Sequence, residues 1–306
     1  MSHRIPIKYL HEELCKKLEL GMSTQKVGVV VLDSNNGIYH VAYVVVEAKT
    51  TSYWTWFMVL LREELELGAN SNFTFISDRQ KAVGKVFPNA EHRFCLRHIY
   101  ENMKKQRKGK KLIDKVCECG RATTLNHFKY AMDGLKKIND EAHVWLCKIP
   151  AETWSKSHFS CRAHTNCLLN NLCEVFNVEI DEGRDKPIIT CLEYIREYLM
   201  KRLCVVQKVI DKCQGELSTT ATITLEDIKA EATKFVAKYN GTGKYQVAST
   251  WHDQYVVNLN ERSCTCRFWE ITGFPCRHAI SSIWNKIENG EDALDVEYWV
   301  HPCYKL

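Results

Sequence analysis

The sequence contains no long hydrophobic run. No apolar stretch among its 306 residues approaches the ~18 residues that a membrane-spanning helix requires. The chain also begins with no hydrophobic signal segment. With 45% hydrophobic residues, it is long enough to bury one substantial core and a small additional module. We therefore expect a soluble intracellular protein without a membrane partner.

The signs of a disulfide framework are missing as well. The chain has 15 cysteines, an odd number, and no secretory signal. Disulfide-dense chains are small secreted domains, whereas cysteines in long intracellular chains are reduced thiols and metal ligands. The sequence also lacks internal repeats and low-complexity tracts. These absences favour a globular protein in which some cysteines bind metal.

A strong excess of charge of one sign is absent too. Forty-two Lys and Arg against 37 Asp and Glu give a formal net charge of +5, which is too mild to indicate nucleic-acid binding by itself. The distribution is more informative, because residues 104–111 are dense in cations. This segment suits phosphate contact or a nuclear import signal, and equally a solvated loop or helix face. Its cations are Lys104, Lys105, Arg107, Lys108, Lys110 and Lys111.

The most specific cysteine pattern lies near the C-terminus. Cys264 and Cys266 are separated by one residue, and Cys276 and His278 follow after nine more. This C-x-C-x9-C-x-H spacing is typical of a tetrahedral zinc site. We expect the first two cysteines to lie on one side of an extended strand, and a turn at residues 273–275 to bring the second pair towards them.

The alternative is a small hairpin with buried cysteines, in which His278 only begins a helix. Zinc is favoured because a module of about 60 residues after residue 244 is too small for a large core. Structural zinc contributes about 10–16 kcal/mol of apparent binding energy to such modules. Because all four expected ligands are protein groups, we predict a structural ion that activates no water.

Apolar runs rich in β-branched residues and helical spacing indicate the order of elements before this module. A hairpin is followed by helix, strand, helix, strand and helix, and then by four further helical stretches. The predicted strands cover 27–32, 38–46, 73–76 and 91–94; the predicted helices cover 54–65, 81–87, 97 onwards, 112–148, 168–176, 188–213 and 225–239.

Several segments together resemble plant Mutator-like element transposases, a group that includes the domesticated far-red-impaired-response-like proteins. The resemblance covers roughly residues 26–304 and ends in the cysteine motif, which is similar to a SWIM-type zinc finger. The segments that carry it are 33–39, 54–57, 75–81, 87–98 and 168–177. The resemblance implies a truncated ribonuclease-H-like core, α/β in class, that has a helical insertion and acts on DNA in the nucleus.

The resemblance also implies domain bounds. An N-terminal helical segment would cover residues 1–25, and the transposase core 26–200, with its insertion at about 105–165. A helical connector would cover 201–240, and the SWIM module 241–306.

The chemistry of this family needs three carboxylates that hold two Mg²⁺ ions. By resemblance, Asp78 matches the second acid and Glu174 the third. The first acid belongs to an Asp-Gly-x-x-Leu stretch upstream, yet residues 1–32 contain no aspartate. We therefore expect that the first strand and first acid are missing, that the core is catalytically inactive, and that Mg²⁺ binds only if it is active.

Both surviving acids have ordinary alternative roles. Asp78 could cap a helix that begins near Arg79, and Glu174 could be a solvent-facing glutamate. The spacing alone favours these ordinary roles. The resemblance favours descent of the two residues from the catalytic acids of the family, and it does not imply that they still function.

Other cysteine and histidine pairs are weaker candidates. Cys95 and His98 match a family feature and form a possible second metal or structural pair. A ladder of His158, Cys161, His164 and Cys167 resembles a ligand set, but buried Cys and surface His are common without metal. Cys117 and Cys119 lack a nearby second pair.

We expect a transposase-derived nuclear protein that binds DNA or a protein partner through its finger and basic segment, without a small-molecule substrate. One alternative is an active metal-dependent transposase that recruits a third acid from elsewhere. Another is a fragmentary transposon product without a specific role.

Overall fold

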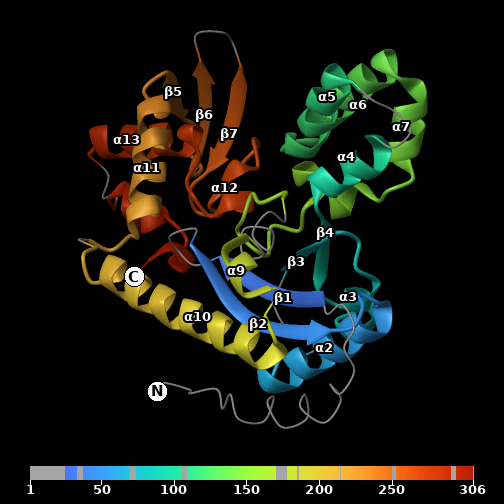
Figure 1. The fold of residues 1–306 in the computed structure, drawn as a ribbon. Coiled ribbons are helices and arrows are strands. Elements are labelled where there is room, and N and C mark those ends of the chain that lie inside the picture. Colours follow the sequence, from blue (N-terminus) through green and yellow to red (C-terminus); the bar gives the residue numbers. More distant parts are fainter. Residues whose placement is uncertain are drawn as a thin grey trace. The chain divides into compact units, whose positions relative to one another are not determined.

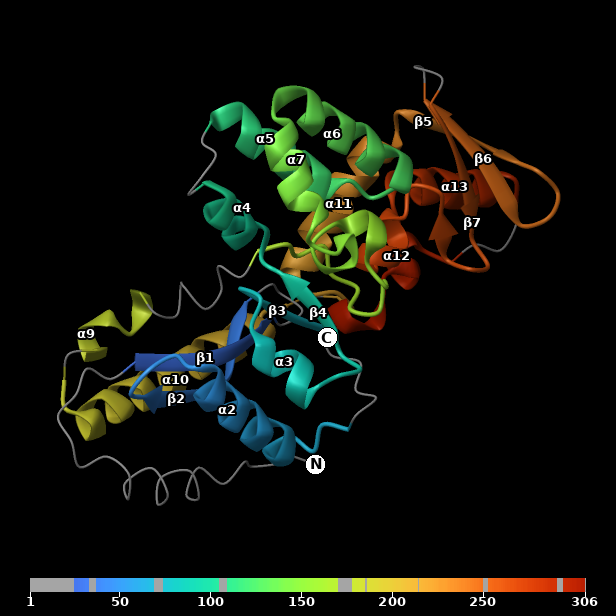
Figure 2. The same cartoon turned by 90° about the vertical axis from the view of Figure 1, so that its right-hand side faces the viewer.

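The computed structural model describes residues 25–32, 37–68, 74–104, 109–169, 178–184, 186–213, 215–249, 253–290 and 294–305 (Figures 1 and 2). These residues form two compact units. Of the described residues, the first unit takes 25–30, 40–68 and 80–90, and the second takes 31–32, 37–39, 74–79 and those from 91 onwards. None of the described helices is long and apolar enough to cross a membrane.

The N-terminal part begins with two paired strands, β1 (Gln25–Leu32) and β2 (Ile38–Val46). Helix α2 (Thr51–Glu64) follows, and the Thr50 hydroxyl caps it by accepting a hydrogen bond from the Tyr53 amide at 3.2 Å. Phe57 of α2 packs with the buried valines of β2 in a small core. The predicted paired strands and first helix are confirmed.

The second unit contains a parallel pair of short strands, β3 (Thr74–Ser77) and β4 (Glu91–Phe94). The register runs from Thr74 opposite Glu91 to Ser77 opposite Phe94. Between them in sequence lies α3 (Lys81–Val86), which belongs to the first unit. Because the strands are parallel, their carboxyl ends meet at one edge, and Asp78 follows β3 at that edge.

A helical region follows β4, as predicted. Its members pack around a core that includes fully buried Met103, Leu135, Leu146 and Trp154. Thr124 and Asn139 cap the N-termini of α6 and α7 through their side-chain oxygens. The helices are α4 (Leu96–Lys104), α5 (Lys110–Arg121), α6 (Leu125–Ile138) and α7 (Asp140–Cys147), followed by the 3₁₀ turns η1 (Ala151–Thr153) and η2 (Lys156–His158).

Two further helices, α9 (Asp181–Arg184) and α10 (Ile188–Ile210), precede the C-terminal module. The helix predicted over 225–239 is wrong in both bounds. Helix α11 (Thr219–Ala232) begins earlier, because the Ser218 hydroxyl accepts from the Ala221 amide and so acts as a cap and not as a helix breaker. The chain then forms strand β5 (Phe235–Tyr239), in which Ala237 is buried and its neighbours Val236 and Lys238 are exposed.

The C-terminal module is a four-stranded antiparallel sheet packed against helices. Its core contains Val257, Trp269 and Ile283, and it also takes in Leu217 and Leu225, upstream of residue 241. The elements after β5 are β6 (Lys244–Ser249), β7 (Gln254–Asn258), β8 (Ser263–Cys264), α12 (Phe268–Thr272), α13 (Arg277–Glu288), η3 (Val296–Trp299) and η4 (Pro302–Tyr304).

Candidate metal centre

The structure brings together all four residues of the cysteine motif. Cys264 ends β8 opposite Val257, and Cys266 follows two residues later. Cys276 is the N-cap of α13, and His278 lies in the first turn of that helix. Their ligand atoms all lie within 4.8 Å of one another, and no other group of three or more such ligands is found in the described part of the chain.

Strand alternation predicted that Cys264 and Cys266 lie on one side of an extended strand. The structure shows that this prediction is wrong. Strand β8 ends at Cys264, and the chain turns at Thr265 and Cys266. The Arg267 amide closes this turn by donating to the Cys264 carbonyl at 2.7 Å, and Arg267 has a left-handed φ of 59°. A tight turn, and not strand alternation, therefore brings the two thiols together.

The second pair is held by the start of α13. Gly273 ends α12 with φ of 78°, a conformation that favours glycine, and its amide donates to the Trp269 carbonyl at 2.7 Å. The Ala279 amide then donates to Cys276 Sγ at 3.4 Å, just as the Cys266 amide donates to Cys264 Sγ at 3.5 Å. Amide donors stabilise negative charge on both sulfurs.

The His278 ring presents Nδ1 to the sulfurs. This atom lies 3.6 Å from Cys264 Sγ and 3.7 Å from Cys276 Sγ. A tetrahedral ion with ordinary Zn–S and Zn–N bond lengths would set these edges at about 3.6 Å. The residues present therefore fit zinc, with Nδ1 as the coordinating nitrogen.

Two aromatic rings hold the imidazole. Tyr255 stacks on His278 with ring centroids 3.7 Å apart, and Phe235 meets it edge-on at 4.7 Å. His278 itself is only 2% exposed. The sequence motif gave no indication of these two rings, which come from β7 and β5.

The protonation of the three thiols is mutually dependent. The hydrogen bond shared with Cys266 raises the pKa of Cys264, and burial raises the pKa of Cys276. Hydrogen bonds from Cys264 and Cys276 lower the pKa of Cys266. Three adjacent thiolates, two of them buried, repel one another, so a divalent cation is needed for all three to ionise.

Four protein ligands complete a tetrahedron, so this arrangement is that of a closed structural site. When bound, zinc would supply cross-links between β8, the turn that follows it and α13.

Asp78 stands at the carboxyl end of β3 with its side chain exposed. It does not cap the next helix. The residue that caps α3 is Gln80, whose side-chain oxygen accepts from the Ala82 amide at 3.2 Å. The helix-cap interpretation of Asp78 is therefore wrong, while Glu174 lies outside the described residues.

The weaker ligand candidates do not assemble a site among the described residues. Cys95 is fully buried between β4 and α4, and His98 lies one turn along α4. The ladder of His158, Cys161, His164 and Cys167 falls in η2 and the loop after it, without forming a ligand group. Cys119 is a buried thiol whose pKa burial raises to about 12.

The basic segment borders two helices. Lys104 ends α4, and Lys110 and Lys111 begin α5, all with exposed side chains. Lys104 lies 3.5 Å from Glu101 on the surface, a weak pairing. Lys105, Arg107 and Lys108 lie outside the described residues.

Comparison with protein families gives two matches. Residues 20–102 match the MULE transposase domain, and residues 255–286 match the SWIM zinc finger. The chain is therefore transposase-like at its N-terminal end and carries a SWIM finger near its C-terminus. The SWIM match encloses Cys264, Cys266, Cys276 and His278, so the geometry and the family agree on a structural zinc site. A search of curated proteins finds no match.

We expect Cys276→Ser to lose zinc and to unfold the C-terminal module while the helical region stays folded. The reason is that three remaining ligands bind zinc far more weakly, and the module depends on the ion. Metal analysis and thermal melting would measure this. The control is Cys303→Ser, which changes an exposed cysteine of the same module. Equal zinc content and equal melting in the two variants would contradict the four-ligand site.

Proposed function

We propose that this chain is a transposase-derived nuclear protein that binds DNA and does not cleave it. Binding would use the basic segment 104–111, and the zinc-loaded SWIM finger would keep the C-terminal module folded. Kinship with domesticated plant regulators, such as the far-red-impaired-response-like proteins, is part of this proposal. The observation that carries it is the MULE match joined to a Cys3His cluster in one chain.

A ribonuclease-H-like core is the fold that we propose for the N-terminal part. The order of elements supports it: a pair of strands, a helix, and then two parallel strands separated by a helix. Asp78 stands at the carboxyl end of the first parallel strand, where such a core would hold its metal-binding acid.

Binding without cleavage is favoured by the acids that are present. Two-metal chemistry needs several carboxylates around one point. Asp78 belongs to no ligand group in the described part of the chain.

One observation favours the second candidate, an active metal-dependent nuclease. The Asp78 carboxylate is exposed and makes no hydrogen bond or ion pair with the residues that the structure describes. A carboxylate without a structural role is available to a metal ion, so activity requires a direct test.

DNA binding through the basic segment predicts a steep salt dependence. The logarithm of the binding constant for duplex DNA falls linearly with the logarithm of the salt concentration, and the slope is about 0.9 per neutralised phosphate. Replacing Lys104, Lys110 and Lys111 by Ala should lower this slope by up to about 2.7. Fluorescence anisotropy across a salt series would measure it.

The matched control changes Lys129, Lys136 and Lys137, three exposed lysines of α6 with the same total charge. The same slope in both triple variants would mean that the basic segment has no specific role. A protein-binding function is indicated if none of these proteins binds DNA.

Catalysis is tested separately with labelled DNA in Mg²⁺ or Mn²⁺. We expect no cleavage or strand transfer above that of Asp78→Asn and Glu174→Gln, because Asp78 joins no group of metal-binding acids in the described part of the chain. Metal-dependent cleavage that both substitutions abolish would overturn the inactive assignment and identify an active transposase.

A further inference from the structure

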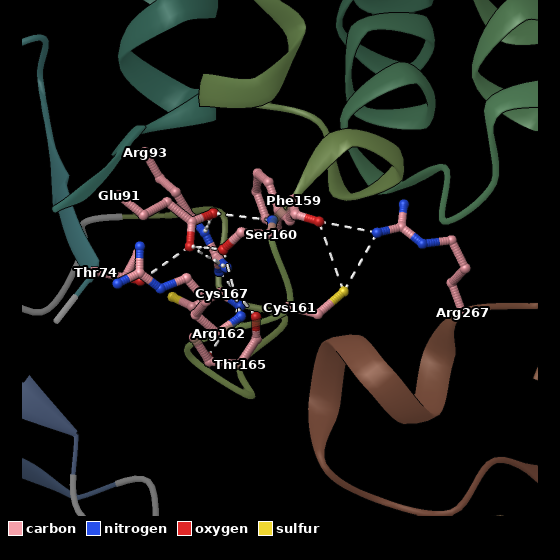
Figure 3. Close-up of polar contacts among 10 residues, drawn as sticks. All are labelled: Thr74, Glu91, Arg93, Phe159, Ser160, Cys161, Arg162, Thr165, Cys167 and Arg267. Carbon is pink, nitrogen blue, oxygen red and sulfur yellow. Dashed lines mark hydrogen bonds and ion pairs between the residues drawn. The ribbon is translucent and has the colours of Figure 1, made fainter. Parts of the chain in front are cut away.

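A stretch of chain between the helical region and residue 170 is held by polar contacts from two sides (Figure 3). We call residues 156–169 the connecting loop. One set of contacts comes from strand β4, and the other from the SWIM finger. All of these residues belong to the second unit.

On the side of β4, Glu91 and Arg93 hold the connecting loop. Glu91 Oε2 accepts from the Ser160 hydroxyl at 2.6 Å, and Arg93 Nη1 donates to the Thr165 carbonyl at 2.9 Å. Arg93 is 1% exposed and lies 3.8 Å from the centre of the Phe159 ring. The Arg93 and Glu91 side chains also pair at 3.1 Å, so this buried charge is compensated.

On the side of the finger, Arg267 makes the corresponding contacts. Its Nη2 donates to the Phe159 carbonyl at 2.9 Å and lies 3.3 Å from Cys161 Sγ, and its Nη1 donates to the Ser157 carbonyl. Figure 3 shows this guanidinium reaching the loop from the finger. A planar fork with several donors suits such neighbouring acceptors, which the single ammonium of lysine would match less well.

A second contact with the connecting loop comes from residues 301–304, at the end of the C-terminal module. The Tyr304 hydroxyl is 2.8 Å from the His164 carbonyl, and the His164 and His301 rings stack with centroids 3.8 Å apart. A Cβ at Gly273 would lie 2.8 Å from the His301 Cβ and 3.2 Å from that of His164, so this approach is close. The C-terminal module therefore contacts the connecting loop at two places, through Arg267 at residues 157–161 and through His301 and Tyr304 at His164.

The position of Arg267 depends on the zinc ligands. It directly follows Cys266, and its own amide closes the turn onto the Cys264 carbonyl at 2.7 Å. Its φ of 59° is a conformation that costs a non-glycine residue free energy. Zinc bound to both cysteines would hold this turn, and with it the direction of the arginine side chain.

We infer that Arg267 is a positioning residue through which zinc binding in the SWIM finger orders the first half of the connecting loop against β4. The inference rests on zinc binding by the finger and not on DNA binding. It predicts that removing zinc or the Arg267 side chain lowers the local stability of one part of the connecting loop and not of the other. Residues 157–162 lose their anchor on the finger, while Thr165 keeps its bond to Arg93.

The test is hydrogen–deuterium exchange at single-residue resolution on the whole chain. Arg267→Ala, with zinc bound, should speed exchange of the His158 and Phe159 amides about tenfold, equivalent to about 1.4 kcal/mol. Removing zinc from the unmodified chain with a chelator should produce at least the same change. The Cys167 amide, near the Arg93 anchor, should change less than about twofold.

The matched control is Arg262→Ala. Arg262 is another arginine of the finger with a left-handed φ, of 50°, but its guanidinium lies over the Tyr298 and Trp299 rings and not against the described residues of the connecting loop. The Arg262→Ala variant should leave amide hydrogen exchange in the connecting loop unchanged. Zinc content, measured in every sample, separates a failure of zinc binding from a failure of the coupling.

Three results would overturn the inference. The first is unchanged exchange at His158 and Phe159 in zinc-bound Arg267→Ala. The second is unchanged exchange there after zinc removal. The third is loss of zinc from Arg267→Ala but not from Arg262→Ala, which would place the role of Arg267 inside the finger.

Discussion

Three thiols, two of them buried, and one buried imidazole within 4.8 Å of one another set the main constraint on the C-terminal part of this chain. Without a cation they cannot all ionise, because neighbouring thiolates in a buried site repel. With zinc they become cross-links between the end of β8, a turn with a left-handed residue, and the start of α13. The small sheet around Val257 then packs on helices that include α11, and the Tyr255 and Phe235 rings enclose the ligand histidine.

The transposase-like part is organised by a different constraint, the direction of its strands. Strands β3 and β4 run parallel, so their carboxyl ends meet at one edge, and Asp78 projects from that edge with no capping role to occupy it. This geometry is compatible with descent from a metal-dependent nuclease. In the described part of the chain Asp78 joins no group of metal-binding side chains, and for this reason the proposal gives this part a binding role.

The sequence predicted the zinc ligands and most elements because these depend on local patterns. The C-x-C-x9-C-x-H spacing identified the ligands, and short runs of β-branched and apolar residues identified β1, β2 and β3. The sequence did not predict β5, because residues 235–239 extend the apolar helical spacing of the segment before them. Pairing with β6 makes this segment a strand. The turn at Cys266 was also missed, because strand alternation was extended through a residue where β8 has already ended. The Arg267 contact with Phe159 was missed because it joins residues more than 100 positions apart. The spacing of Asp78 before a helix suggested a cap, yet Gln80 fills that position.

X-ray absorption at the zinc edge tests the central claim most directly, because it reports the number and type of atoms around the metal. The account predicts three sulfurs at about 2.3 Å and one nitrogen at about 2.0–2.1 Å in the purified chain. A shell dominated by oxygen or nitrogen, or one with four sulfurs, would contradict the Cys3His site, and with it the explanation of how the C-terminal module is held together.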